Sequence, residues 1–179
     1  MQEDLLCRGG ACLRPTRKNI RLQGYDYSQN GAYFITICTE DRKALFGEIV
    51  VGAGLVSARM ELSNAGKMIE DVLVNTTEIF GCILDKYIVM PNHIHCIVMI
   101  DRAETSPAPT IGDLVCAFKS KATVEYINGV KSSCYPSFNR RLWQRNYHDR
   151  IIRNEAEYLR IWQYIDENPL RWDEDEYYL

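Results

Sequence analysis

The chain has 179 residues, 46% of them hydrophobic, and a net charge of −3. This length supports one full hydrophobic core, and no internal repeat indicates a solenoid. The apolar runs are too short to span a membrane, and the acidic first residues do not resemble a secretory signal, so we expect a soluble cytoplasmic protein.

The seven cysteines include no Cys-x-x-Cys pair and stand mostly in apolar contexts. An odd number of scattered cysteines does not suit a disulfide framework or a structural zinc site. We therefore expect reduced thiols, mostly in the core.

The first elements follow from composition and periodicity. Residues 1–24 lack periodicity and are expected to form a flexible arm. Residues 32–39 (AYFITICT) are short and rich in β-branched and aromatic side chains, which predicts a buried strand. Residues 45–51 and 56–62 flank a glycine-containing turn and predict a hairpin.

The middle of the chain predicts a helix and two strands. Ser63 or Asn64 is expected to cap a helix that extends to about Phe80. Residues 83–90 and 94–100 predict two antiparallel strands, joined across a Pro-Asn pair that cannot lie in a central ladder.

The last third predicts two more helices and an edge strand. Residues 111–127 show a helical apolar face, and residues 147–152 predict a short edge strand. Asn154 is expected to cap a third helix, with Glu157 in the capping-box position and Asn168-Pro169 at its end. This order predicts an α+β fold in which helices pack on one face of an antiparallel sheet.

His93 and His95 are two of the three histidines and lie two apart in a predicted strand. Their imidazoles should project from one face of the sheet, with Ile94 directed into the core. Two protein ligands leave several positions on a metal open, which suits catalysis better than a structural role. The alternative is a pair of hydrogen-bonded strand histidines that face solvent.

Tyr164 and Asn168 are one turn apart on the third predicted helix, so the phenol and the amide can reach one small volume. Both lie at the border of an apolar stripe, a position that suits the wall of a cleft. That stripe consists of Tyr158, Ile161, Trp162 and Ile165. The alternative is a tyrosine half-buried at a helix edge.

Three strings, YIVMPNHIHCIVMI, LWQRNYHDRIIRNEAEYL and QYIDENPLRW, resemble the HUH-type single-tyrosine transposases, nearest the REP-associated tyrosine transposases. The resemblance covers about residues 25–172 and implies a ferredoxin-like sheet. It implies a divalent metal, Mg or Mn, on His93 and His95, with Tyr164 as the nucleophile and Asn168 as a third ligand. It also implies single-stranded DNA substrates with hairpins and no nucleotide cofactor.

The resemblance leads to a specific hypothesis about function. Residues 25–172 would form a catalytic domain that cleaves and rejoins single-stranded DNA through a 5′-phosphotyrosine, and residues 173–179 an acidic tail. Two alternatives stay open, a domesticated hairpin-specific nickase and a non-catalytic protein that binds hairpins. Relatives act as monomers or as dimers that exchange the tyrosine helix, so a homodimer also stays open. The histidine-triad nucleotide hydrolases need a third histidine where this chain has Ile97.

Basic residues cluster although the net charge is negative, so one face of the protein can still bind phosphates. A solvated surface is the alternative for each cluster. The expected DNA contacts are Lys119, Lys121, Arg140, Arg141, Arg145 and Arg150.

Overall fold

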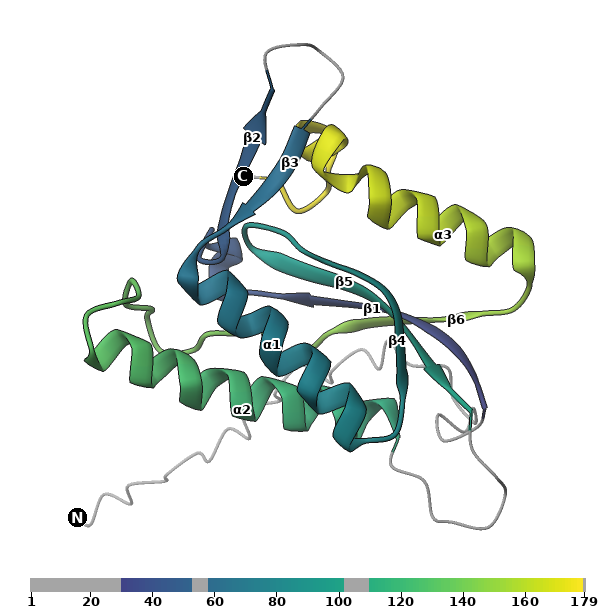
Figure 1. The fold of residues 1–179 in the computed structure, drawn as a ribbon, viewed down its shortest axis with the longest axis horizontal. Helices are drawn as coiled ribbons and strands as arrows, with labels where there is room; N and C mark the ends of the chain where they lie inside the picture. The colour runs from purple at the N-terminus through teal and green to yellow at the C-terminus, as the bar shows by residue number, and fades with distance from the viewer. Residues whose placement is uncertain (1–29, 53–57, 102–109, 179) are drawn as a thin grey trace, which may run out of the picture.

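A computed structural model describes residues 30–52, 58–101 and 110–178 (Figure 1). The predicted arm and most of the predicted glycine turn lie outside these ranges. The elements in chain order are β1 (Gly31–Cys38), the 3-10 turn η1 (Glu40–Arg42), β2 (Gly47–Val51), β3 (Ala58–Leu62), α1 (Asn64–Ile79), β4 (Ile83–Val89), β5 (His93–Ile100), α2 (Ile111–Lys131), β6 (His148–Ile152), α3 (Glu155–Glu167) and the 3-10 segment η2 (Asn168–Glu174).

Four strands form an antiparallel sheet in the order β4-β5-β1-β6. The chain order β1-α1-β4-β5-α2-β6 with this strand order is the ferredoxin-like arrangement. β2 and β3 form a separate hairpin, which stands beyond the end of the sheet and beside η2 (Figure 1). The predicted α+β class and antiparallel sheet are confirmed.

The main core lies between the sheet and the helices α1 and α2. Strand alternation directs Ile35 and Ile37 of β1 and Ile94 of β5 into it, where they meet Ile69 of α1 and Phe118 of α2. All five side chains are 1% exposed or less. Each such burial contributes roughly 1.5–3 kcal/mol, so this face of the sheet holds the domain together.

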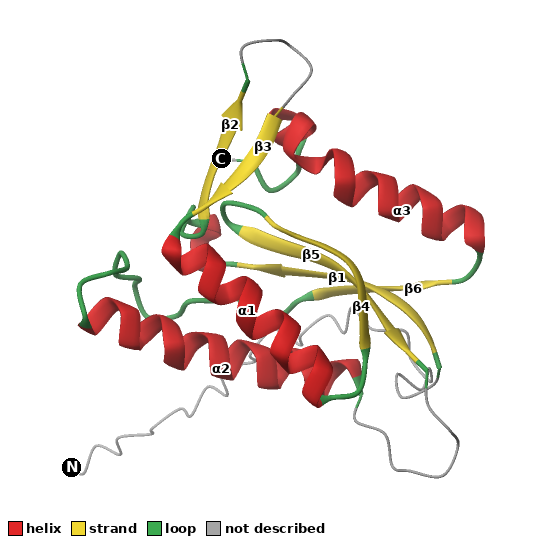
Figure 2. Ribbon diagram, in the orientation of Figure 1, coloured by secondary structure: helices red, strands yellow, loops and turns green. Residues whose placement is uncertain are grey.

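α3 lies on the opposite face of the sheet from α1 and α2 (Figure 2). Its Ile161 and Ile165 pack on Ile97 of β5 in a second, smaller cluster. The expectation that the helices pack on one face therefore holds for α1 and α2 and not for α3. The physical reason lies in β5, which is apolar on both faces and can bury a helix on each. The histidine face of β5 is consequently the face that α3 covers.

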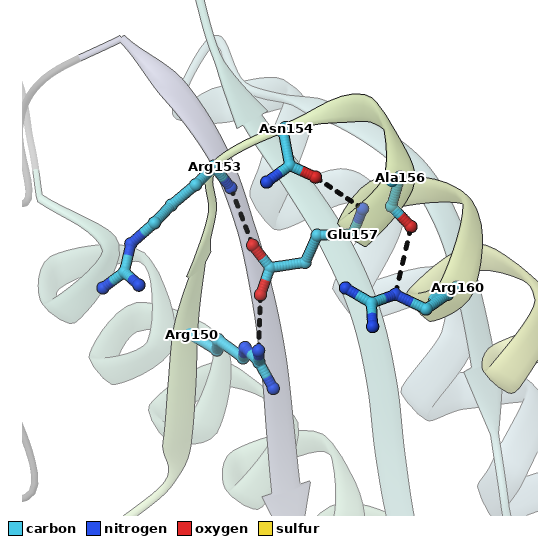
Figure 3. Close-up of polar contacts among 6 residues, drawn as sticks. All are labelled: Arg150, Arg153, Asn154, Ala156, Glu157 and Arg160. Atoms are coloured by element: carbon cyan, nitrogen blue, oxygen red, sulfur yellow. Dashed lines mark hydrogen bonds and ion pairs between the residues drawn. The ribbon is translucent and has the colours of Figure 1, made fainter.

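The start of α3 is tied to β6. Asn154 Oδ1 accepts the predicted cap bond from Glu157 N at 2.9 Å. The Glu157 carboxylate does not return to Asn154 but accepts from Arg153 N at 3.0 Å and pairs with Arg150 at 2.6 Å (Figure 3). The hydrogen bond from Arg153 and the charge of Arg150 lower the pKa of Glu157.

α3 is also tied to β4. The Tyr158 hydroxyl donates to Asp85 at 2.6 Å, and Lys86 pairs with Asp166 at 2.5 Å. The Lys86 ammonium also lies 3.9 Å from the centre of the Trp162 ring. Trp162, expected in the apolar stripe, is 38% exposed and binds a cation instead. These contacts fix the direction of the helix that carries Tyr164.

α2 continues to Lys131, beyond the predicted end at Ile127. A Cβ at Gly129 would lie 2.0 Å from the Tyr135 ring, so this glycine serves close packing within the helix. Cys38 and Cys96 are free and buried. Among the described residues no helix combines the length and apolar character needed to cross a membrane.

Candidate active site

His93 and His95 lie at the beginning of β5, on the face that α3 covers. Their ring centroids are 4.4 Å apart, so both imidazoles project from one face of the strand as predicted. The two side chains are 0% and 1% exposed, so they do not face solvent as the alternative interpretation requires.

The tautomer of His93 is fixed by Asn92. Asn92 Nδ2 donates to Arg42 O at 3.1 Å and Tyr177 O at 2.8 Å, so Asn92 Oδ1 must accept from His93 Nδ1 at 2.8 Å. The Nε2 atom of His93 therefore presents its lone pair to the site. This atom is buried and has no hydrogen-bond partner within the described part of the chain. An oriented and unpartnered lone pair is what a metal ligand supplies.

His95 is held by its neighbour across the sheet. Its Nδ1 lies 2.8 Å from the hydroxyl of Thr36, its register partner on β1. Its Nε2 lies 3.2 Å from the hydroxyl of Tyr164, and Phe34 stacks on the ring at 5.3 Å. The His95 imidazole thus faces α3, and its contacts with Thr36 and Phe34 hold its orientation.

Both histidines are neutral at pH 7. Burial lowers the pKa of His93 to about 4, the charge of Arg42 adds to this effect and Asp175 opposes it. Burial also holds the pKa of His95 well below its usual value, and the neighbouring His93 adds to this. A neutral imidazole is the form that binds a metal ion.

The low pKa of His93 predicts a stability that falls in acid. Between its folded value of about 4 and its unfolded value of 6.5, the unfolded chain binds more protons, so stability rises with pH in this window. We expect the free energy of unfolding in urea to be about 2 kcal/mol lower at pH 5 than at pH 7 from His93 alone. His93→Gln should remove that part of the difference. If the free energy of unfolding of this variant depended on pH as strongly as that of the wild type, the lowered pKa of His93 would be contradicted.

Tyr164 and Asn168 converge as the helix spacing predicted, and they meet at Asp175. The Tyr164 hydroxyl lies 3.2 Å from Asp175 Oδ2, and Asn168 Nδ2 donates to the same oxygen at 2.6 Å. Tyr164 is 39% exposed although its hydroxyl touches a buried histidine. Burial raises the pKa of Tyr164, and the Asp175 carboxylate raises it further. Asn168 Oδ1 is buried and has no partner among the described residues.

Asp175 belongs to a part of the site that sequence reasoning missed. Its carboxylate and the two imidazoles present ligand atoms that all lie within 4.8 Å of one another. The segment expected as an acidic tail turns back through η2 against the histidines. The Trp172 ring stacks on His93 at a centroid distance of 5.9 Å, and the Tyr177 ring packs against His93 in a tilted arrangement at 4.7 Å. The sequence did carry one indication that this segment packs on the domain: aromatic residues stand among its acidic residues, and a fully solvated tail is usually poor in aromatic side chains.

A groove of about 800 Å³ opens beside the histidines. Its lining includes the basic side chains of His148 and Arg150 of β6 and Arg160 of α3, and the acidic side chains of Glu174 and Glu176 of the C-terminal segment. His95 and Tyr164 also line it. Thr36 is the register partner of both His95 and His148, so a polar row crosses the sheet from His95 on β5 to His148 on β6.

The six predicted DNA contacts separate into three groups. Arg150 lines the groove. Lys119 is half-buried and donates to Gln144 O and Asn146 O, each at 2.9 Å, and burial lowers its pKa to about 8. The others are exposed on α2 and in the following loop, away from the groove lining: Lys121, Arg140, Arg141 and Arg145. Arg160, one turn before Tyr164, was missed.

Comparison with known proteins gives consistent results. A family model described as IS200-like transposase matches residues 28–168. A protein of Haemophilus influenzae, itself uncharacterized, is 33% identical over 187 residues, which cover 91% of this chain and 93% of that protein.

Two solved structures share the fold. A REP-associated tyrosine transposase bound to a REP hairpin superposes with a TM-score of 0.56 at 16% identity, over 83% of this chain and 72% of that one. A candidate transposase of Deinococcus radiodurans gives 0.50 at 21% identity, over 82% of this chain and 95% of that one.

Proposed function

The chain belongs to the IS200-like transposase family, and on that premise we propose that it cleaves and rejoins single-stranded DNA with Tyr164 as the nucleophile. The observation that carries the proposal is the 3.2 Å contact between the Tyr164 hydroxyl and His95 Nε2 inside an open groove. It joins an accessible nucleophile to a candidate metal ligand. Both groups belong to one copy of the chain, so a homodimer is not required to complete the site.

We propose that His93, His95 and Asn168 bind Mg or Mn. His93 Nε2 and Asn168 Oδ1 fit this role, because both are buried and unpartnered within the described residues. Imidazole favours Mn, whereas the amide oxygen and phosphate oxygens favour Mg. When bound, such a cation polarises the scissile phosphate and supplies several kcal/mol of transition-state stabilisation.

The proposed reaction is a transesterification. The Tyr164 oxygen bonds to phosphorus as the bond from phosphorus to O3′ breaks; the phenol loses its proton and O3′ gains one. The products are a 5′-phosphotyrosine and a free 3′-hydroxyl. The covalent link conserves the ester bond, so a second 3′-hydroxyl can reseal the strand without a nucleotide cofactor. The raised pKa of Tyr164 explains why the phenol needs activation.

The groove suits an unpaired strand. Arg150, Arg160 and His148 all line the groove and can bind phosphates, and Phe34, also in the lining, offers an aromatic ring to a base. The solved relative is bound to a REP hairpin, which supports a hairpin substrate for this chain also. We propose the exposed cations of α2 and the following loop as contacts to the paired stem.

The test is incubation with a pool of hairpin-bearing single strands and Mn²⁺, read on a denaturing gel. A protein–DNA adduct on one oligonucleotide supports the transposase or the domesticated nickase. Binding without an adduct would leave the hairpin-binding alternative and overturn the proposal.

Binding to the same strands should weaken as salt rises. Arg160→Ala should reduce the slope of log affinity against log salt by about 0.7, the value for one phosphate contact on a single strand. Arg59→Ala, an exposed arginine on the hairpin strand β3, is the control and should leave the slope unchanged. Equal slopes for both variants would place the strand elsewhere.

A further inference from the structure

We propose that Asp175 is a ligand of the metal ion, so that the C-terminal segment completes the metal site. The proposal rests on the function proposed above and adds a residue beyond the family match, which ends at residue 168. Its basis is the cluster of His93, His95 and Asp175, whose ligand atoms lie within 4.8 Å of one another. Ligands on one ion stand about 3–4 Å apart at bond lengths of about 2.1 Å, so a small inward movement suffices.

The carboxylate is held in place by groups of the site itself. Asp175 Oδ2 accepts from Asn168 Nδ2 at 2.6 Å and from the Tyr164 hydroxyl at 3.2 Å. Asp175 Oδ1 accepts from Tyr177 N at 2.7 Å. A ligand oriented by such hydrogen bonds needs little reorganisation to bind an ion.

Charge supplies the second argument. An imidazole binds a metal ion in its neutral form, so two histidine ligands offset none of the charge of a divalent cation. Within the described ranges no lysine or arginine forms an ion pair with Asp175, and Arg42 Nη1 instead donates to Glu176 O at 2.6 Å. The half-buried Asp175 carboxylate lies beside the unpartnered His93 Nε2 and forms no ion pair with a described lysine or arginine, and its hard oxygen suits Mg²⁺ or Mn²⁺.

The segment is docked by contacts that do not use the Asp175 side chain. Asn92 Nδ2 donates to Tyr177 O, and the Trp172 and Tyr177 rings pack on His93. Asp175→Asn should therefore keep the segment in place while it removes the charge.

The first test is Mn²⁺ affinity by titration calorimetry. Asp175→Asn should bind Mn²⁺ at least about tenfold more weakly than the wild type. Asp173→Asn removes the same charge from an exposed residue two positions earlier and should stay within about twofold. Thermal unfolding in EDTA should show that both variants fold.

The second test is the visible spectrum of bound Co²⁺, which depends on the coordinating atoms. At saturation Asp175→Asn should shift the d–d bands, and Asp173→Asn should not. Unchanged Mn²⁺ affinity and an unchanged Co²⁺ spectrum in Asp175→Asn, with His95→Gln impaired, would overturn this inference alone. A wild type that binds no Mn²⁺, or a His95→Gln variant that binds it normally, would overturn the proposed metal site itself.

Discussion

Tyr164→Phe is expected to lower DNA cleavage by at least about a thousandfold, because it removes the nucleophilic oxygen and nothing else. The ring packs edge-on against Phe34 at 6.1 Å and against His95 at 5.2 Å, and phenylalanine keeps both contacts. Folding, Mn²⁺ binding and DNA binding should persist. Denaturing gels over a time course, with fluorescence anisotropy for binding, separate the two effects.

The structure brings a second tyrosine, Tyr177, close to the histidines, which makes it an alternative candidate for the nucleophile. Its ring lies 4.7 Å from His93, but the residue is 7% exposed, whereas Tyr164 is 39% exposed and lines the groove. Tyr158 donates its hydroxyl to Asp85 of β4 and is not among the residues that line the groove. Tyr177→Phe and Tyr158→Phe should therefore retain most of the cleavage. An adduct mapped to either residue by mass spectrometry would show that the nucleophile is misplaced.

His95→Gln is expected to weaken Mn²⁺ binding at least about a hundredfold and to lower adduct formation in parallel. The loss follows from removing one of two neutral imidazoles that face the site. Glutamine is the better substitution, since alanine would leave a cavity at a residue 1% exposed. Its amide can also keep the bond to Thr36. Calorimetry measures the affinity, and a urea titration checks that the variant folds.

A mixing experiment tests whether one chain holds the whole site. A mixture of the Tyr164→Phe and His95→Gln proteins is expected to stay inactive. The Tyr164 hydroxyl and the His95 imidazole meet within one chain, so neither variant can supply the group that the other lacks. Activity restored on mixing would mean that two copies exchange α3. Normal Mn²⁺ affinity in His95→Gln would contradict the metal role of this residue.

Local sequence determined most of the elements and half of the site. Strand alternation placed His93 and His95 on one face, and helix spacing placed Tyr164 and Asn168 on one flank of α3. The cap at Asn154 followed from a bond between near neighbours. These features depend on residues close together in the sequence, so their relative placement follows wherever the strand or helix forms.

Other features of the fold and the site depended on how helices and strands distant in the sequence pack against one another. An apolar stripe shows that α3 is buried but not on which side of the sheet, because β5 is apolar on both. From its charge, Lys119 was predicted to contact DNA. In the structure its ammonium donates to two backbone carbonyls that lie near it only in the folded chain. The burial that lowers the pKa of His93 comes from rings distant in sequence.

The place of Asp175 was decided by tertiary structure alone. The sequence determined that an acidic, aromatic segment follows the Asn-Pro pair, but not that η2 turns it back to the histidines. That turn is stabilised by Asn92 and Arg42, each more than eighty residues earlier and held by β5 and η1. No local pattern encodes contacts between such distant partners, since they form only when the sheet and α3 have already brought the segments together.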